Sequence, residues 1–213
     1  MITLFIVSII SCSRKQTIEN ETKYLDEFYS VLNEIARNKY PEVSLIVNET
    51  KPVFRTYYGS YPVPKPSKEI PPPPPPLGIV CYNHNTFMFL KERKQIDSAN
   101  AEFMLYSIDS TKTFLLDSTK TNLHLIPKSK IIEVYKFYRD NFKEKHIEFK
   151  NFFGSKCFLE VATPIFNSNY TKVIFTLECK GDTIIEEPYN LYVYEKTGGK
   201  WKQINGEEII ETR

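Results

Sequence analysis

Glycine is scarce in this chain: there are only seven among 213 residues. Phosphate-binding loops and the nucleophile turns of the α/β-hydrolases are built on closely spaced glycines. Neither a phosphate-binding glycine loop nor a Gly-x-Ser-x-Gly motif occurs in the sequence, and the zinc-protease motif His-Glu-x-x-His is missing as well. These absences argue against the enzyme classes that such motifs mark, and we expect no catalytic residues and no cofactor.

Histidine and cysteine are also few. His84, His124 and His146 are scattered, and no two of them lie at the spacing of zinc ligands, so we predict no metal site. Cys81 lies three residues before His84, and a cysteine and a histidine can act together as nucleophile and base. Two residues that flank a predicted turn more often share no chemistry, and this is the interpretation we favour.

An excess of charge of one sign is absent. The chain has 28 basic and 26 acidic residues, which are well mixed and give a formal net charge of +2. It therefore has no basic patch that would predict binding to nucleic acid or to anionic lipid. We interpret Glu186-Glu187 and Glu207-Glu208 as solvated surface charge, because acid–base catalysis needs two carboxylates that face each other across a cleft.

The apolar run at the N-terminus is too short to span a membrane, which takes roughly 20 helical residues. Residues 1–11 fit the apolar part of a secretory signal peptide. Ile9-Ile10-Ser11-Cys12 resembles the bacterial lipobox, whose cysteine is diacylated and becomes the new N-terminus. We therefore expect a signal peptide at 1–11, a palmitate-type lipid anchor on Cys12 and a polar tether at 12–21. The alternatives are an ordinary signal peptide and a buried N-terminal strand.

Two stretches have the apolar spacing of amphipathic helices. We predict one helix at 22–39, which ends before Pro41, and a second at 129–145. The apolar stripe of the first helix is rich in aromatic side chains, and we interpret it as core packing. It consists of Tyr24, Leu25, Phe28, Val31, Leu32, Ile35 and Ala36.

A proline-rich stretch separates the two helices. Residues 61–77 include six consecutive prolines, Pro71 to Pro76. Proline fixes φ and lacks a backbone donor, so this stretch predicts an extended polyproline-II loop. It is either a docking ligand for an aromatic groove or a stiff surface spacer, and we favour the spacer. A hairpin is expected after it at 79–90, with its turn at Asn83-His84-Asn85.

The last third of the chain has the clearest strand pattern. Val173, Phe175 and Leu177 alternate with polar residues, which is the two-residue period of a half-buried strand. Short turns between successive strands require antiparallel pairing. We therefore predict an antiparallel β-meander with the two helices on one face, in a single α+β domain at 22–213. Its strands are expected at 157–166, 170–180, 189–196 and 200–204.

The first hairpin of this meander brings two cysteines together. If it closes through a three-residue loop, Phe166 faces Tyr170 and the same register sets Cys157 opposite Cys179. Directly opposed residues can be near enough for a disulfide, which an envelope compartment allows. The alternative is that Cys179 is a small core residue on the apolar face.

Four segments near the C-terminus carry a recognisable pattern: Thr163-Pro164-Ile165-Phe166-Asn167, Tyr170-Thr171-Lys172-Val173, Leu191-Tyr192-Val193-Tyr194-Glu195-Lys196 and Gly199-Lys200-Trp201-Lys202. They resemble the C-terminal half of small uncharacterised lipoproteins of Bacteroidetes. In those proteins a strand ending in Phe-Asn or Phe-Ser precedes a threonine-lysine strand, and a final hairpin turns at Asn-Gly-Lys-Trp. The resemblance implies an envelope location and no known activity.

These observations leave two functions open. The first is a non-enzymatic envelope lipoprotein that is held to the membrane by its N-terminal lipid and contacts an envelope protein or glycan through its sheet or its proline-rich loop. The second is an envelope hydrolase or a small-ligand-binding protein. Its site is expected in the concavity of the sheet, where Tyr192, Tyr194 and Trp201 are the candidate ligand contacts.

Overall fold

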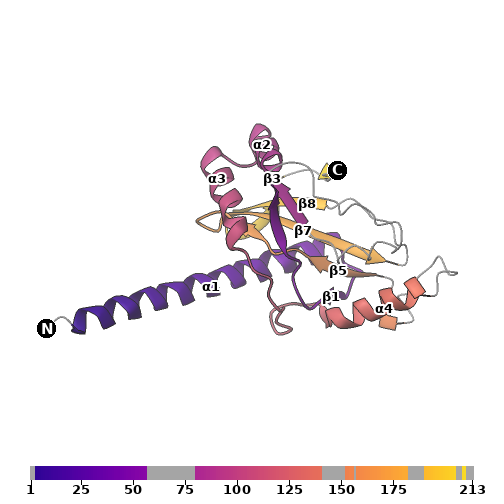
Figure 1. Cartoon of the computed structure of the whole chain (residues 1–213). Coiled ribbons are helices and arrows are strands. Elements are labelled where there is room, and N and C mark those ends of the chain that lie inside the picture. Colours follow the sequence, from indigo (N-terminus) through magenta and orange to yellow (C-terminus); the bar gives the residue numbers. More distant parts are fainter. Residues whose placement is uncertain are drawn as a thin grey trace, which may run out of the picture.

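A long N-terminal helix crosses one face of a mixed β-sheet, and shorter helices with a second, two-stranded sheet cover the other face (Figure 1). The computed structural model describes residues 3–56, 80–140, 152–155, 157–181, 190–204 and 208–209. The predicted α+β class is confirmed. The proline-rich stretch 61–77 lies outside the described residues.

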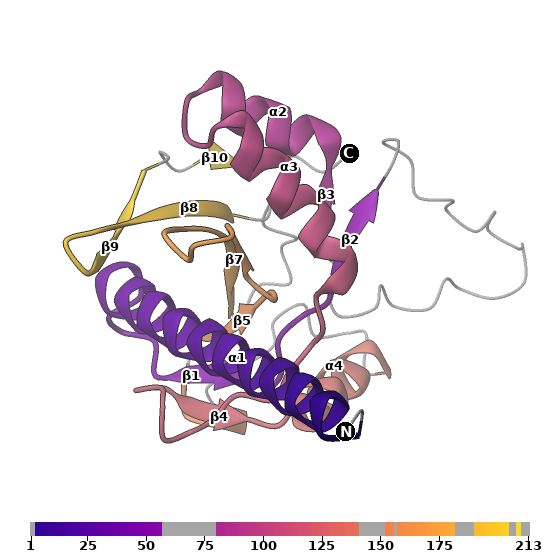
Figure 2. The ribbon, with the colours of Figure 1, turned by 90° about the vertical axis from the view of Figure 1, so that its left-hand side faces the viewer.

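The first helix, α1 (Thr3–Lys39), is longer than the sequence pattern suggested. Its packed part matches the predicted helix at 22–39, since Phe28, Val31, Leu32 and Ile35 are fully buried against the sheet. Residues 19–23 are exposed, so packing begins near Tyr24. The expected tether at 12–21 is therefore helical, and Figure 1 shows the N-terminal half of α1 projecting away from the body, while Figure 2 shows α1 crossing in front of the sheet.

The main sheet has the strand order β10-β8-β7-β5-β1-β4, with β6 also paired to β7 and β9 to β8. The three strands β4, β1 and β5 are parallel. All other pairs in this sheet are antiparallel, and the chain from β7 through β8 to β9 is the predicted meander. The strands are β1 (Leu45–Val47), β4 (His124–Ile126), β5 (Cys157–Val161), β6 (Ile165–Phe166), β7 (Lys172–Gly181), β8 (Asn190–Thr197), β9 (Lys200–Gln203) and β10 (Glu208–Ile209).

Both faces of this sheet are buried, which corrects the expectation of one covered face. Val173, Phe175 and Leu177 of β7 pack under α1, while Ile174 packs in the cluster on the other side. That second side is covered by α4 (Lys128–Asp140), by α2 (His84–Glu92) and α3 (Ser98–Ser107), by the short helix η1 (Ile108–Ser110), and by the parallel pair β2 (Val53–Thr56) and β3 (Val80–Asn83).

The two predicted helices therefore lie on opposite faces of the sheet. The one at 129–145 is confirmed as α4 over its described part, but it packs on Phe158, whose side chain points away from α1. The predicted hairpin at 79–90 is wrong, because β3 leads directly into α2. Phe87 and Leu90 are three residues apart, so they share the buried face of that helix. No helix in the described part of the chain is both long and apolar enough to cross a membrane.

Candidate functional site

A buried lysine pairs with two buried glutamates on the sheet face opposite α1. The Nζ atom of Lys51 lies 2.6 Å from Oε2 of Glu160 and 2.9 Å from Oε2 of Glu178. None of these three side chains is more than 8% exposed. Glu160 on β5 and Glu178 on β7 are direct cross-strand partners. The sheet therefore holds two like charges side by side, and the ammonium group of Lys51 offsets their repulsion.

The backbone fixes Lys51 at the C-terminal end of β5. Its N–H donates to the carbonyl of Val161 at 2.7 Å, and its own carbonyl accepts from the N–H of Thr163 at 3.0 Å. The hydroxyl groups of Thr50 and Thr163 hydrogen-bond to each other at 3.1 Å beside it. These contacts hold the main chain of Lys51 in place, so that its side chain extends along the sheet toward the two carboxylates.

The carboxylates keep Lys51 charged. Burial alone lowers the pKa of a lysine, but the charges and hydrogen bonds of Glu160 and Glu178 outweigh it, and the pKa of Lys51 is raised above its ordinary value. Lys180 adds a second cation, with its Nζ atom 3.1 Å from Oε2 of Glu178. Two ammonium groups thus face two carboxylates, and charge balance of this kind is what permits ionic groups to be buried.

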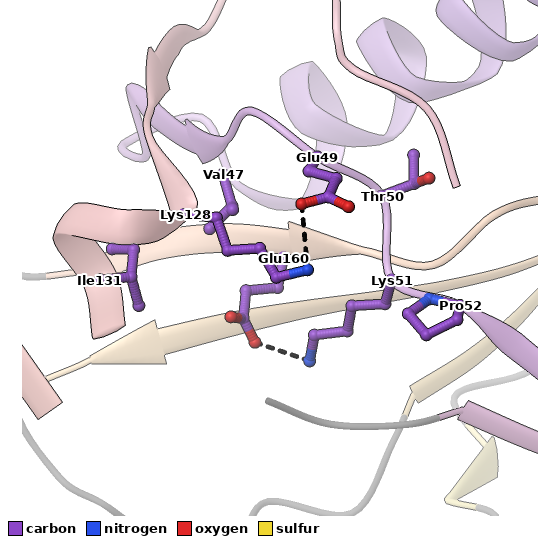
Figure 3. A pocket seen from close by; sticks show the side chains of 8 residues that line it. All are labelled: Val47, Glu49, Thr50, Lys51, Pro52, Lys128, Ile131 and Glu160. Carbon is purple, nitrogen blue, oxygen red and sulfur yellow. Dashed lines mark ion pairs between the residues drawn. The ribbon is translucent and has the colours of Figure 1, made fainter. Parts of the chain in front are cut away.

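A small hollow lies beside this cluster (Figure 3). Glu49 and Lys128 form an ion pair of 3.0 Å across it, and Lys51 and Glu160 form another of its sides. The cavity volume of this hollow is about 20 Å³. That volume holds a single water molecule and is far too small for an organic ligand.

The chemistry open to this cluster is narrow. A lysine that acts as a nucleophile must lose its proton near neutral pH, which requires a lowered pKa. The pKa of Lys51 is shifted the other way, and both carboxylates are already engaged by ammonium groups. We therefore interpret the cluster as a structural one that fixes the pairing of β5 with β7. The sequence pattern gave no sign of this cluster, because the alternation in β7 predicted that Glu178 is solvated.

The aromatic residues proposed as ligand contacts lie under α1. Tyr192, Tyr194 and Trp201 are at most 4% exposed and belong to the core cluster that α1 completes. The hydroxyl group of Tyr192 is 2.9 Å from that of Tyr40, and the pKa of Tyr194 is raised, chiefly by burial and further by Tyr192 and Glu34. The expected concavity is therefore filled by a helix of the same chain, and these rings do not line an open site.

The predicted register of the cysteines is wrong by two residues. Cys179 pairs with Leu159, Cys157 pairs with Gly181, and neither cysteine forms a disulfide. The turn is longer than expected, because Phe166 faces Val173 rather than Tyr170. The side chain of Asn167 stabilises this longer turn, since its Oδ1 atom accepts hydrogen bonds from the N–H groups of residues 171 and 172. The side chains of Cys12 and Cys81 lie outside the described residues.

The other candidate groups stay apart. His84 is exposed on α2 and His124 is exposed on β4, while His146 and Glu186-Glu187 lie outside the described residues. Among the side chains that the structure does describe, no three His, Cys, Asp or Glu residues gather where they could hold a metal ion.

Comparison with known proteins adds no further candidate. No family model, no curated protein and no solved structure matches this chain. The function must therefore be argued from the residues and the geometry described above.

Proposed function

We propose that this chain is a lipid-anchored protein of the bacterial cell envelope, whose folded body binds another envelope component and catalyses no reaction of its own. The anchor is assigned to Cys12, the last residue of the lipobox-like segment Ile9-Ile10-Ser11-Cys12. The partner is an envelope protein or a glycan.

The observation that carries this proposal is the course of α1 between Cys12 and the body. Residues 19–23 are exposed, and the first ring that packs on the sheet is that of Tyr24, 5.3 Å from Phe166. The body therefore begins well after Cys12, and Figure 1 shows the N-terminal half of α1 projecting away from it. An acylated terminal cysteine needs this arrangement if its chains are to enter a bilayer.

Two features of the body favour binding over catalysis. The buried cluster around Lys51 is neutralised from within, and its lysine is held in the protonated form. The hollow next to it admits one water molecule. A contact with a large partner needs neither a deep pocket nor a reactive side chain, since such interfaces are formed on the outer surface of a fold.

The proposal is tested by replacing the anchoring cysteine in the full chain. Cells that express the wild type, Cys12→Ser or the matched control Cys179→Ser are labelled with palmitate and fractionated. We expect label and membrane flotation for the wild type and the control, and neither for Cys12→Ser. A wild-type chain that carries no label and is recovered outside the membrane fraction would contradict the proposal.

A further inference from the structure

The segment between Cys12 and the body is part of one uninterrupted helix. The helix α1 runs from Thr3 to Lys39 without a break, although its contacts with the sheet begin only near Tyr24. The hydroxyl group of Tyr24 donates to the carbonyl of Pro164 at 3.0 Å. Just before it, Lys23 is exposed with its ammonium group 4.9 Å from the centre of the Tyr170 ring. These two residues mark where the helix leaves the body.

The residues N-terminal to Tyr24 are expected to be helical on physical grounds. Starting a helix is costly because several residues must be ordered for one hydrogen bond, whereas each further residue adds one bond. The buried stripe from Phe28 to Ile35 supplies the nucleus. Glu19 and Lys23 are four residues apart with the acidic residue first, which is the favourable order for a stabilising pair on a helix. Residues 12–23 contain no proline or glycine.

We propose that residues 12–23 form a helical spacer that holds the folded body about 18 Å from the lipid surface, at a rise of about 1.5 Å per residue. This inference rests on the proposed lipid anchor at Cys12. Figure 1 places α3 at the end of the body from which α1 projects and α4 toward the opposite end. The spacer therefore turns α3 toward the lipid and leaves α4 on the far side.

A helical spacer and a flexible tether differ in the spread of distances rather than in the mean. A flexible chain of this length has a root-mean-square span of about 20 Å, from about 5–6 Å multiplied by the square root of the residue number. That value is close to the length of the helix. The width of the distance distribution therefore separates the two, and so does the response to a change in helix propensity.

The test uses the full, lipidated chain in phospholipid vesicles, with Cys81, Cys157 and Cys179 replaced by serine. Spin labels are attached at Lys15→Cys in the spacer and Glu102→Cys on α3, and pulsed electron paramagnetic resonance measures the distance between them. We expect one narrow distribution. It broadens when the three residues at 19–21 are changed to glycine, which disfavours helix, and it stays narrow when they are changed to alanine. A second label pair at Glu102 and Glu133, both exposed on the body, stays narrow in every variant if the fold is intact.

The orientation is read on the same vesicles by energy transfer to a fluorescent lipid headgroup. A donor at Glu102 on α3 is expected to transfer more efficiently than a donor at Glu133 on α4. A broad distribution in the unsubstituted spacer, or equal transfer from the two donors, would overturn the inference. Palmitate on Cys12 is measured in parallel. Its absence contradicts the proposed function, whereas a lipidated chain with a broad distribution contradicts the spacer alone.

Discussion

The two faces of the main sheet are both buried, but they are filled in different ways. On the α1 side, the strands contribute rings and aliphatic groups, as with Phe175 packed 6.0 Å from Phe28 between ring centres. On the opposite side, the same strands contribute charged and hydroxyl groups in addition to aliphatic ones such as Ile174 and Val193. Glu160 and Glu178 meet Lys51 there, and Thr176 hydrogen-bonds to Tyr82. Both faces therefore remove apolar area from water, but only the face opposite α1 also buries charged groups within its apolar cluster, where the pairing of β5 with β7 depends on polar contacts.

The largest expected effect is alkaline unfolding, because high pH ionises buried tyrosines on both faces of the sheet and removes the charge of Lys51. Burial raises the pKa of Tyr24 and Tyr194 on the α1 side and of Tyr82 on the other, and their neutral forms are favoured in the fold. The pKa of Lys51 is raised because its charged form is favoured. The pKa values of these groups in the unfolded chain are 10.0 for tyrosine and 10.5 for lysine. Below these pH values all four groups contribute their full stabilisation of the fold, and this stabilisation is lost as the pH rises above them.

We therefore expect cooperative unfolding above about pH 10. The buried tyrosines should ionise only as the chain unfolds, which is measured by tyrosinate absorbance and circular dichroism on the same sample. If these tyrosines ionised in a chain that kept its native circular dichroism, the burial on which the comparison depends would be disproved.

The next effect is confined to the polar face. Lys51→Met leaves Glu160 buried without a cation and Glu178 with Lys180 alone, so we expect a loss of roughly 3–5 kcal/mol in the free energy of unfolding by urea. The control Lys128→Met breaks the ion pair with Glu49, which is partly exposed, and should cost less than about 1 kcal/mol.

A further variant separates loss of charge balance from loss of packing. Changing Glu160 and Glu178 to leucine in the Lys51→Met background removes the uncompensated carboxylates, so much of the lost stability should return. A Lys51→Met chain as stable as the wild type would show that the carboxylates do not depend on this lysine.

The smallest expected effect concerns the apolar face. Leu32→Ala opens a cavity where α1 meets the sheet, because Leu32 is fully buried. We expect a loss of about 3 kcal/mol, within the usual range for such truncations. Ile132→Ala on α4 is the control, since Ile132 is exposed and its truncation should change the free energy of unfolding by less than about 0.5 kcal/mol. Equal effects from the two variants would mean that α1 is not packed on the sheet as described.

The parts of the fold that follow from local periodicity were predicted from the sequence. The spacing of Phe28, Leu32 and Ile35 identified the packed half of α1, and the alternation around Phe175 identified β7. The prediction for the stretch after β3 was wrong, because an asparagine-rich segment between short apolar runs fits a hairpin turn as well as the start of a helix. His84 begins α2 instead.

The cluster around Lys51 could not be predicted from the sequence, for a different reason. Lys51 and Glu178 are 127 positions apart in the chain, and nothing in the local sequence of either links them. The burial of Tyr192, Tyr194 and Trp201 likewise depends on α1 packing on that face of the sheet. Their alternation placed them on an apolar face but could not tell whether a ligand or the chain's own helix covers it.

The central claim, that a lipid on Cys12 carries this body at a membrane, is tested most directly by the intact mass of the native protein. We expect a chain that begins at Cys12, carries acyl groups on that residue and is recovered from the membrane fraction. A chain that retains Met1, bears no acyl group and is recovered free of membranes would contradict it.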